Sequence, residues 1–365
     1  MRSADAPIQS LAVAAYIVPT ETPESDGTLE WTSTTLVTVE VTAAGQTGFG
    51  YTYAGLEAAT LISQVLAPEL EGRDAMAIPA AWQAMIAAVR NLGHRGVAAT
   101  AISAVDAALW DLKGRLLDLP LVRLIGAARP DVPVYGSGGF TSYDVPRLQR
   151  QLAGWAAEGF PSVKMKVGRA PAEDDRRVRA AREALGPSVE LMVDANGAYD
   201  RKQALRFAEL FAGYGVTWFE EPVSSDDLEG LRLLRDRGPA GMAITAGEYA
   251  YDLYDFRRLI EAGAVDVLQA DATRCCGITG FLRAGALCAA HALPLSAHTA
   301  PSLHVAPCCA LPGVRHIEYF FDHGRIEELL FDGAPRPKGG VLRPDVSRPG
   351  LGVMLKRQDA ARFAA

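Results

Sequence analysis

The chain has 365 residues, of which 49% are hydrophobic and 22% charged, and its formal net charge is -7. This composition is typical of a globular protein with a large interior, and the length predicts two domains or one barrel with additions. Because the mild negative charge is spread along the chain without a basic stripe, we expect no nucleic-acid partner.

No apolar run approaches the roughly 18 residues of a membrane span, so we expect no membrane partner either. The short apolar stretch near the start fits a strand better than a secretory leader. The cysteines form neither a disulfide framework nor a zinc-binding C-x-x-C pair, and a reducing cytoplasm is the simple prediction for location. They are Cys275, Cys276, Cys288, Cys308 and Cys309.

The first third of the sequence predicts a separate α+β unit, residues 1–130. Residues 9–16 alternate weakly, and residues 19–27 are polar and rich in turn formers. Two strand-like runs joined by an Ala-Ala-Gly turn predict a hairpin over 33–41 and 47–53. Helical periodicity follows in residues 56–70, 80–89 and 97–117.

Residues 131–330 form a repeating pattern of short β-rich runs separated by helical segments. The first run is VPVYGSGG and the last is VRHIEYF. Alternation of strand and helix predicts a parallel sheet, and eight such units predict a (β/α)8 barrel. The Pro/Gly-rich tail, residues 331–365, is expected to pack back on the first unit.

Charged residues in a barrel strand must point inward, because the other side of the strand packs against apolar helices. In SVKMKVG this rule places Lys164 and Lys166 side by side on the inner face. Two ammonium groups this close are expected to lower each other's pKa, which would make a lysine a usable base near neutral pH. The alternative is a pair of solvated surface lysines, but a barrel strand has no solvated face.

The next three strands each supply a carboxylate at the end where barrel active sites are built. These are Asp194, followed two residues later by Asn196, then Glu220 and Glu248. One strand-helix repeat separates each from the next, so we expect the three to converge. All-oxygen ligation suits a hard cation, so magnesium is predicted, with manganese as an alternative. The alternative is that the three carboxylates are helix caps or form ion pairs in loops.

The sixth strand ends in Asp271, the seventh in His298, and the eighth contains Glu318. An aspartate one strand away can accept the second ring N–H of a histidine, fixing its tautomer and raising its basicity. A protonated Glu318 could donate to a developing oxyanion. The alternative for His298 is a core histidine whose hydrogen bonds are all satisfied, and the alternative for Glu318 is a buried acid with a structural role.

These motifs resemble those of the enolase superfamily, in its mandelate racemase subgroup, over nearly the whole chain. The K-x-K, D-x-N, F-E-E-P, G-E, strand-six aspartate and S-x-H motifs occur in family order, one per strand, after the alanine-rich AISAVDAALWDLKGR segment. Each is weak alone, but six in order are very specific. The resemblance implies that residues 1–130 are a capping domain, with lid loops at about 19–31 and 51–55.

The resemblance also implies a role for each matching residue. Asp194, Glu220 and Glu248 would bind magnesium. Lys166 would be the base on one face of a carbon next to the substrate carboxylate, and Lys164 would help to stabilise the enolate.

His298, oriented by Asp271, would serve the other face, and Glu318 would stabilise the enediolate oxygen opposite the metal. Muconate-lactonising and dipeptide-epimerase relatives differ, since they have a lysine in place of Asp271. One departure is Cys276, at a position where glycine is common. Its side chain is expected either to stiffen or to crowd the loop after Asp271.

Two opposed bases permit two outcomes after proton abstraction. Loss of a β-hydroxyl as water would make the chain an acid-sugar dehydratase giving a 2-keto-3-deoxy acid. Reprotonation would make it a racemase or epimerase of a 2-hydroxy acid. We favour dehydration, because sugar-acid dehydratases are numerous in the subgroup and the polar segments Glu21–Glu30 and Tyr51–Gly55 could meet hydroxyls. Trp31 and Tyr53 would suit either substrate.

Two other classes remain as alternatives. A Schiff-base lyase could use Lys166 covalently, but it would not need three converging carboxylates. A catalytically silent binding relative would be expected to have lost a base or a ligand, and none is missing. The expected partner is a small carboxylate, and a homo-oligomer is expected.

Overall fold

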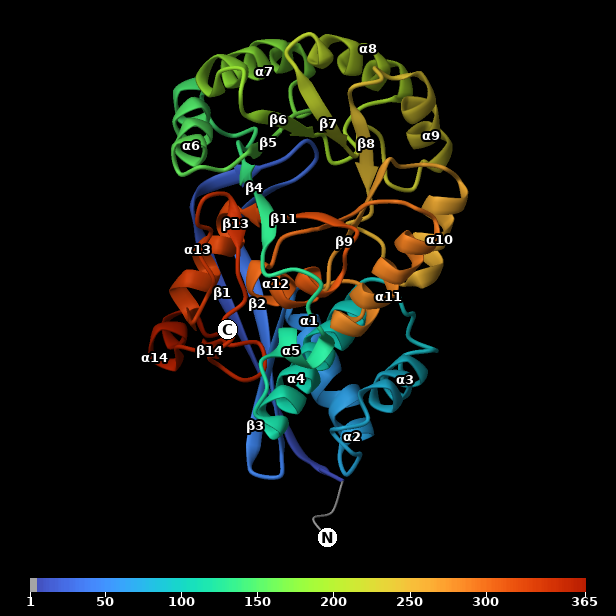
Figure 1. Cartoon of the computed structure of the whole chain (residues 1–365), viewed down its shortest axis with the longest axis vertical. Coiled ribbons are helices and arrows are strands. Elements are labelled where there is room, and N and C mark those ends of the chain that lie inside the picture. The colour runs from blue at the N-terminus through green and yellow to red at the C-terminus, as the bar shows by residue number, and fades with distance from the viewer. Residues whose placement is uncertain (1–4) are drawn as a thin grey trace.

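The computed structural model describes residues 5–365, so residues 1–4, with which the predicted first unit begins, lie outside it. In Figure 1 the capping strands and helices occupy the lower part of the molecule, and helices α6–α10 arch around the barrel strands above. No helix within residues 5–365 is long and apolar enough to cross a bilayer.

The capping sheet has three antiparallel strands: β1 (Ile8–Ser25), β2 (Glu30–Ala43) and β3 (Gln46–Tyr53). The predicted hairpin is confirmed. The prediction that residues 19–27 are turn-rich is wrong as far as Ser25, because β1 continues after an irregularity and pairs Ser25 with Glu30. Backbone pairing with β2 overrides the polar, turn-forming composition of this segment.

The turn between β1 and β2 is therefore short. Asp26 closes it by accepting the backbone N–H groups of Thr28 and Leu29 at 2.6 and 2.7 Å. Gly27 lies at its tip, where a Cβ would come within 2.2 Å of the carbonyl oxygen of Ala195, just beyond a barrel strand. The long β1–β2 ribbon thus reaches from the capping unit to the open end of the barrel (Figure 1).

The predicted capping helices are confirmed, the first being divided by a π-helical turn. Helix α4 lies so close to β3 that a Cβ at Gly50 would meet the carbonyl oxygen of Ala104 at 2.3 Å, which explains the alanine-rich sequence. The elements are α1 (Leu56–Leu61), η1 (Ile62–Leu66), α2 (Ala67–Leu70), α3 (Ile78–Ala88), α4 (Val97–Leu117) and α5 (Leu121–Ile125).

The barrel is closed, since its eight parallel strands end with β11 paired to β4. Its strands are β4 (Val132–Gly138), β5 (Ser162–Lys166), β6 (Glu190–Asp194), β7 (Val216–Glu220), β8 (Ala243–Ala246), β9 (Val267–Ala270), β10 (Leu295–Ala297) and β11 (Val314–Phe320). Its helices are α6 (Val145–Ala157), α7 (Pro171–Leu185), α8 (Arg201–Ala212), α9 (Leu228–Arg237), α10 (Leu253–Glu261), α11 (Gly277–Ala290), α12 (Pro301–Ala310) and α13 (Phe321–Leu330).

The C-terminal segment contacts both units. Strand β13 (Val341–Leu342) pairs with β4, and β12 (Phe331–Asp332) pairs with β14 (Met354–Leu355). Beyond β14, α14 (Arg357–Ala360) and the 3-10 turn η2 (Ala361–Phe363) reach the capping sheet. There Arg357 donates to both oxygens of Glu40 at 2.5 and 2.7 Å.

A buried polar joint holds α4 of the capping unit against the start of α11. Asp106 accepts the backbone N–H of Thr279 at 2.9 Å and its hydroxyl at 2.6 Å, while Ser103 accepts the N–H of Gly277 at 3.0 Å. A Cβ at Gly277 would meet Asp106 at 2.3 Å, so only glycine permits this approach. The joint fixes the end of the loop that begins at Asp271.

Candidate active site

Strand register brings the polar residues to one end of the barrel. Lys166, Asp194 and Glu220 are successive partners across β5, β6 and β7, so they form one row. Paired residues of parallel strands point to the same side of the sheet, and this row points into the barrel. The predicted parity is therefore confirmed for these positions.

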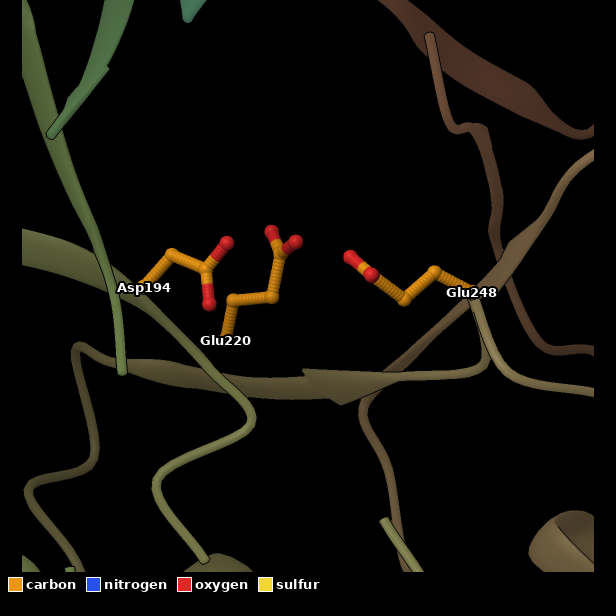
Figure 2. A group of neighbouring side chains, drawn as sticks. All are labelled: Asp194, Glu220 and Glu248. Atoms are coloured by element: carbon orange, nitrogen blue, oxygen red, sulfur yellow. The ribbon is translucent and has the colours of Figure 1, made fainter. Parts of the chain in front are cut away.

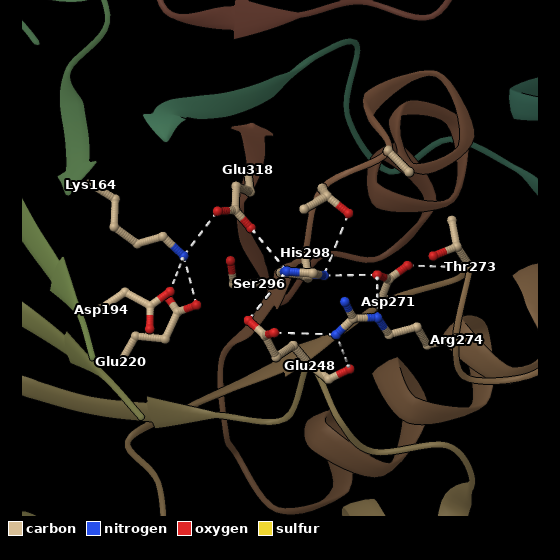
Figure 3. A network of polar contacts seen from close by, with 12 residues as sticks. Lys164, Asp194, Glu220, Glu248, Asp271, Thr273, Arg274, Ser296, His298 and Glu318 are labelled. Carbon is tan, nitrogen blue, oxygen red and sulfur yellow. Dashed lines mark hydrogen bonds and ion pairs between the residues drawn. The ribbon is translucent and has the colours of Figure 1, made fainter. Parts of the chain in front are cut away.

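Both lysines are buried among carboxylates. Lys166 Nζ donates to Asp194 Oδ2 at 2.5 Å and to Asn196 Oδ1 at 3.1 Å. Lys164 Nζ lies 2.6 Å from Glu220 Oε1 and 2.9 Å from Glu318 Oε1, as Figure 3 shows for this residue. The interpretation of the pair as solvated surface lysines is wrong.

The expectation that a neighbouring ammonium group leaves Lys166 with a lowered pKa is wrong for this structure, although Lys164 does act in that direction. Burial lowers the pKa of Lys166, and Lys164 lowers it further, but the adjacent Asp194 and the other carboxylates raise it above its ordinary value. The pKa of Lys164 is raised for the same reason, chiefly by Glu220 and Glu318. Opposite charges at hydrogen-bond distance outweigh one like charge farther away.

The three predicted metal ligands converge. One oxygen from each of Asp194, Glu220 and Glu248 lies within 4.8 Å of the others, and all three residues are buried. Figure 2 shows the carboxylates turned toward a common space. Burial, followed by the nearby charge of Asp194, raises the pKa of Glu220 to about 8.

His298 and Asp271 meet as predicted, with Nδ1 of the imidazole 2.7 Å from Oδ2 of the carboxylate. The other ring nitrogen, Nε2, faces Glu248 Oε2 at 3.2 Å and Glu318 Oε2 at 3.7 Å (Figure 3). Burial lowers the pKa of His298, but Glu248, Glu318 and Asp271 together raise it to about 10. In this arrangement the imidazole is protonated and can act as an acid.

Glu318 lies where the sequence places it, on the inner face of β11, but not in the protonation state considered for it. Burial raises its pKa, whereas Lys164 and then His298 lower it to about 2. Glu318 is therefore ionised here. A donor role toward an oxyanion would require it to gain a proton.

The charge of the site fits a divalent cation. Six carboxylates face only four cationic side chains, and buried charges are stable only when they are paired. The carboxylates are Asp194, Glu220, Glu221, Glu248, Asp271 and Glu318, and the cations are Lys164, Lys166, Arg274 and His298. Magnesium prefers oxygen ligands of this kind, and Asp194, Glu220 and Glu248 are placed to hold it.

A cavity of about 340 Å³ opens between this cluster and the capping unit. Lys166, Glu248 and His298 line its barrel end. Trp31 and Tyr53 line the capping side, with residues of both lid segments, from Asp26 to Gly55. The predicted lid segments therefore border the same cavity as the predicted bases.

Three residues at this cavity or beside it were not predicted from the sequence. Arg274 Nη1 lies 3.2 Å from Glu248 Oε1, and its Nε lies 3.7 Å from Asp271 Oδ2. Glu221 adds a buried carboxylate beside the trio, and His323 stacks on Tyr53 with ring centroids 3.5 Å apart. Glu221 follows Glu220 directly in the F-E-E-P motif, and Arg274 lies in the loop between Asp271 and Cys276, so their position beside predicted residues was the available signal. His323 had none.

The cysteines are all free and buried, and none lines the cavity. Cys276 has φ 63 and ψ 40, a left-handed conformation that glycine adopts without strain. Its Sγ lies 3.3 Å from Nε2 of His94, whose Nδ1 lies 3.2 Å from Oδ2 of Asp252. The side chain thus ties the loop after Asp271 to the capping unit, which favours stiffening over crowding.

Comparison with known protein families gives two matches that together span most of the chain. Residues 12–126 match the mandelate racemase / muconate lactonizing enzyme N-terminal domain. Residues 147–360 match the enolase C-terminal domain-like family.

Two characterised relatives are similar along most of their length. A 3,6-anhydro-alpha-L-galactonate cycloisomerase from Streptomyces coelicolor is 38% identical, over 90% of this chain and 91% of its own. An L-talarate/galactarate dehydratase from Salmonella typhimurium is 32% identical, over 96% of this chain and 89% of its own.

Three solved structures superpose closely. A mandelate racemase/muconate lactonizing enzyme-like protein from Rubrobacter xylanophilus has TM-score 0.96 and 58% identity, covering 98% of this chain and 100% of its own. A racemase from Streptomyces coelicolor A3(2) with bound magnesium has TM-score 0.92 and 35% identity, with 98% and 100% covered. L-Talarate dehydratase from Polaromonas, complexed with magnesium and L-glucarate, has TM-score 0.90 and 31% identity, with 99% and 98% covered.

Proposed function

The chain belongs to the mandelate racemase and muconate lactonizing enzyme family of the enolase superfamily, and from this premise we propose that it dehydrates an acid sugar. The reaction would begin with removal of the proton next to the carboxylate and end with a 2-keto-3-deoxy acid. The observation that supports it best is the placement of Lys166 and His298 on one cavity beside the carboxylate trio.

Asp194, Glu220 and Glu248 would hold magnesium. When bound, the ion supplies positive charge to the substrate carboxylate and offsets the carboxylate charge that keeps the Lys166 pKa high. Lys164, which lies 2.9 Å from Glu318, would donate to an enediolate oxygen. Such donors lower the barrier because they interact more strongly with the enediolate than with the substrate.

The placement of the two bases supports dehydration. Lys166 would take the proton from C2. His298 would give a proton from Nε2, the ring nitrogen that the contact with Asp271 leaves facing Glu248 and Glu318, to the departing C3 hydroxyl. The C3–O bond then breaks, water leaves, and the enol tautomerises to the 2-keto acid. Asp271 keeps the imidazole oriented through these steps.

An isomerase is the second candidate, because the Streptomyces coelicolor relative at 38% identity is a cycloisomerase. It would share proton chemistry next to a carboxylate and differ in what becomes of the intermediate. A racemase of a 2-hydroxy acid would instead return the proton from the opposite base. Product analysis separates the three outcomes.

The test is a screen of mono- and dicarboxylic acid sugars with magnesium, read out as 2-keto acid and as deuterium exchange at C2. We expect both signals with the wild type, and a loss of at least about 10²-fold in Lys166→Ala. Lys202→Ala, which removes an exposed lysine on α8, is the matched control. Full activity of Lys166→Ala would end the assignment.

Borohydride trapping with substrate addresses the Schiff-base alternative. A reduced adduct on Lys166 would replace enolisation with covalent catalysis. A homo-oligomer also remains a prediction, which light scattering of the purified protein would test.

A further inference from the structure

The cationic residues of the cavity are confined to its barrel end. Lys166, Arg274 and His298 all line this end, and each is already paired with a carboxylate of the cluster. His323 is the remaining basic residue among those that line the cavity. Burial lowers its pKa to about 3, with His298 lowering it further, so it adds no positive charge.

The capping side of the cavity, which we call the distal wall, offers hydroxyl groups, aromatic rings and acid. Asp26 is the charged residue among those that β1, β2, β3 and their connections contribute to the lining. The distal wall comprises Asp26, Leu29, Trp31, Ser33, Thr34, Thr35 and Tyr53.

Two more acidic side chains lie behind this wall. Trp31 donates its indole N–H to Glu24 at 3.1 Å, and Thr34 donates its hydroxyl to Asp322. Glu24 and Asp322 are both fully buried. Burial, followed by the charge of Asp322, raises the pKa of Glu24 to about 8, and Asp322 is paired with Arg325, so neither group offers positive charge to an anion at the distal wall.

The arginines nearest to the lid segments form hydrogen bonds or ion pairs with residues outside the cavity lining. Arg325 donates to Asp322 and, at 2.8 Å, to the carbonyl oxygen of Pro19. Arg169 lies 3.5 Å from Glu30, and Arg147 lies 4.0 Å from Glu21. None of the three lines the cavity.

The remaining polar groups at the distal wall can form hydrogen bonds with neutral hydroxyl groups of a substrate. His323 is buried with Nδ1 lacking a partner among the described residues, while its ring stacks on Tyr53. A neutral imidazole nitrogen can accept or donate one hydrogen bond, depending on its tautomer. Ser33 and Thr35 add hydroxyls that do both.

We propose that the substrate bears a single carboxylate, bound at the barrel end, and a neutral polyhydroxyl chain against the distal wall: an aldonic rather than an aldaric acid. The inference rests on the proposed function and narrows its substrate class. A second carboxylate at the far end would lose water beside Asp26 at a wall that offers no cationic side chain to pair with it, which is unfavourable. A hydroxymethyl group has no such cost.

The test compares pairs that share all four stereocentres and differ only at C6, such as D-gluconate with D-glucarate and D-galactonate with galactarate, within a panel of all configurations. The readouts are C2 deuterium exchange and 2-keto acid formation with magnesium. We expect kcat/KM to be at least about tenfold higher for the aldonate of each active pair. The free energy of a tenfold difference is small compared with the cost of removing water from a carboxylate that gains no positive partner. Equal or higher values for aldarates would overturn this inference and leave the proposed function standing. No reaction with either class would overturn the proposed function itself.

A variant with an added positive charge tests whether the distal wall is what distinguishes aldonates from aldarates. Ser33→Arg places a cation on the distal wall and should raise kcat/KM for aldarates relative to aldonates by about fivefold, the size of a partly exposed ion pair. Thr32→Arg is the matched control, because Thr32 is exposed on the same strand but does not line the cavity. An unchanged ratio in Ser33→Arg, or an equal change in Thr32→Arg, would contradict the assignment of the distal wall as the selective element.

Discussion

Oδ2 of Asp271 lies 2.7 Å from Nδ1 of His298 because the residues before them, Ala270 and Ala297, are partners on neighbouring strands. This contact leaves the other imidazole nitrogen facing Glu248 and Glu318 beside the cavity. An aspartate so placed sets the tautomer and orientation of the histidine.

Asp271→Asn should separate the two halves of the reaction. The amide keeps the shape but removes the charge that orients and protonates His298. We expect dehydration to fall by about 10²–10⁴-fold, while exchange of the C2 proton through Lys166 falls much less. Parallel measurement of 2-keto acid and of C2 exchange checks this, with the exchange serving as the internal control for folding. Dehydration at the wild-type rate would show that the contact is not needed.

Magnesium should stabilise the fold as well as support activity. The carboxylates of Asp194, Glu220 and Glu248 repel one another, and a bound dication relieves this repulsion. At about 100 times its Kd, a ligand that binds only the folded state adds about 2.7 kcal/mol to the free energy of unfolding. Thermal unfolding with EDTA and with added magnesium measures the shift, and EDTA should abolish activity until magnesium is restored.

The matched pair for this experiment is Glu248→Gln and Glu229→Gln. Glu248 contributes to the trio, whereas Glu229 has an 89% exposed side chain on α9. The shift caused by magnesium should shrink in the first variant and persist in the second. Equal shifts in both would place the ion elsewhere.

The Asp106 joint should make stability depend on pH. Burial raises the pKa of Asp106 from 3.8 to about 7, although its hydrogen bonds from Thr279 lower it. Between these values the folded state binds more protons than the unfolded state, so stability falls as pH rises. The contribution of this group approaches about 1.4 kcal/mol per pH unit within that window.

Denaturant unfolding at pH 5 and pH 8 measures this effect. The difference in unfolding free energy between the two pH values should be smaller in Asp106→Asn, because the amide does not titrate. An unchanged difference would mean that Asp106 is ionised throughout and that other groups cause the dependence.

Cys276 offers a test of backbone strain. Its left-handed conformation costs a residue with a side chain about 1–2 kcal/mol, and glycine avoids that cost but loses some of the gain through its more flexible unfolded chain. Cys276→Gly and Cys276→Ala both lose the contact with His94. We therefore expect the glycine variant to be more stable than the alanine variant by about 1 kcal/mol, measured by denaturant unfolding. The reverse order would show that this loop relaxes in the alanine variant.

Much of the fold was predictable because its signals are local. Alternation of strand and helix, repeated eight times, predicts the barrel, and the apolar requirement of the helix-facing side assigns Lys164 and Lys166 to the inner face. The exception is the segment ending at Ser25, whose strand conformation depends on its pairing with Glu30 of β2. Composition alone does not encode that pairing.

Most residues of the site could be predicted from the sequence, but their pKa values could not. Which side of each strand carries charge follows from the sequence, as does the order of the motifs along the chain. The distances of the folded chain establish that Asp194 lies 2.5 Å from Lys166, close enough to raise rather than lower the lysine pKa, and that Lys164 keeps Glu318 ionised. The folded chain also brings His323 of α13 onto Tyr53 of β3 at the distal wall, a contact that no sequence pattern predicts. The physical reason is that strand parity follows from a two-residue period, whereas pKa values and cavity walls depend on distances between segments far apart in the chain.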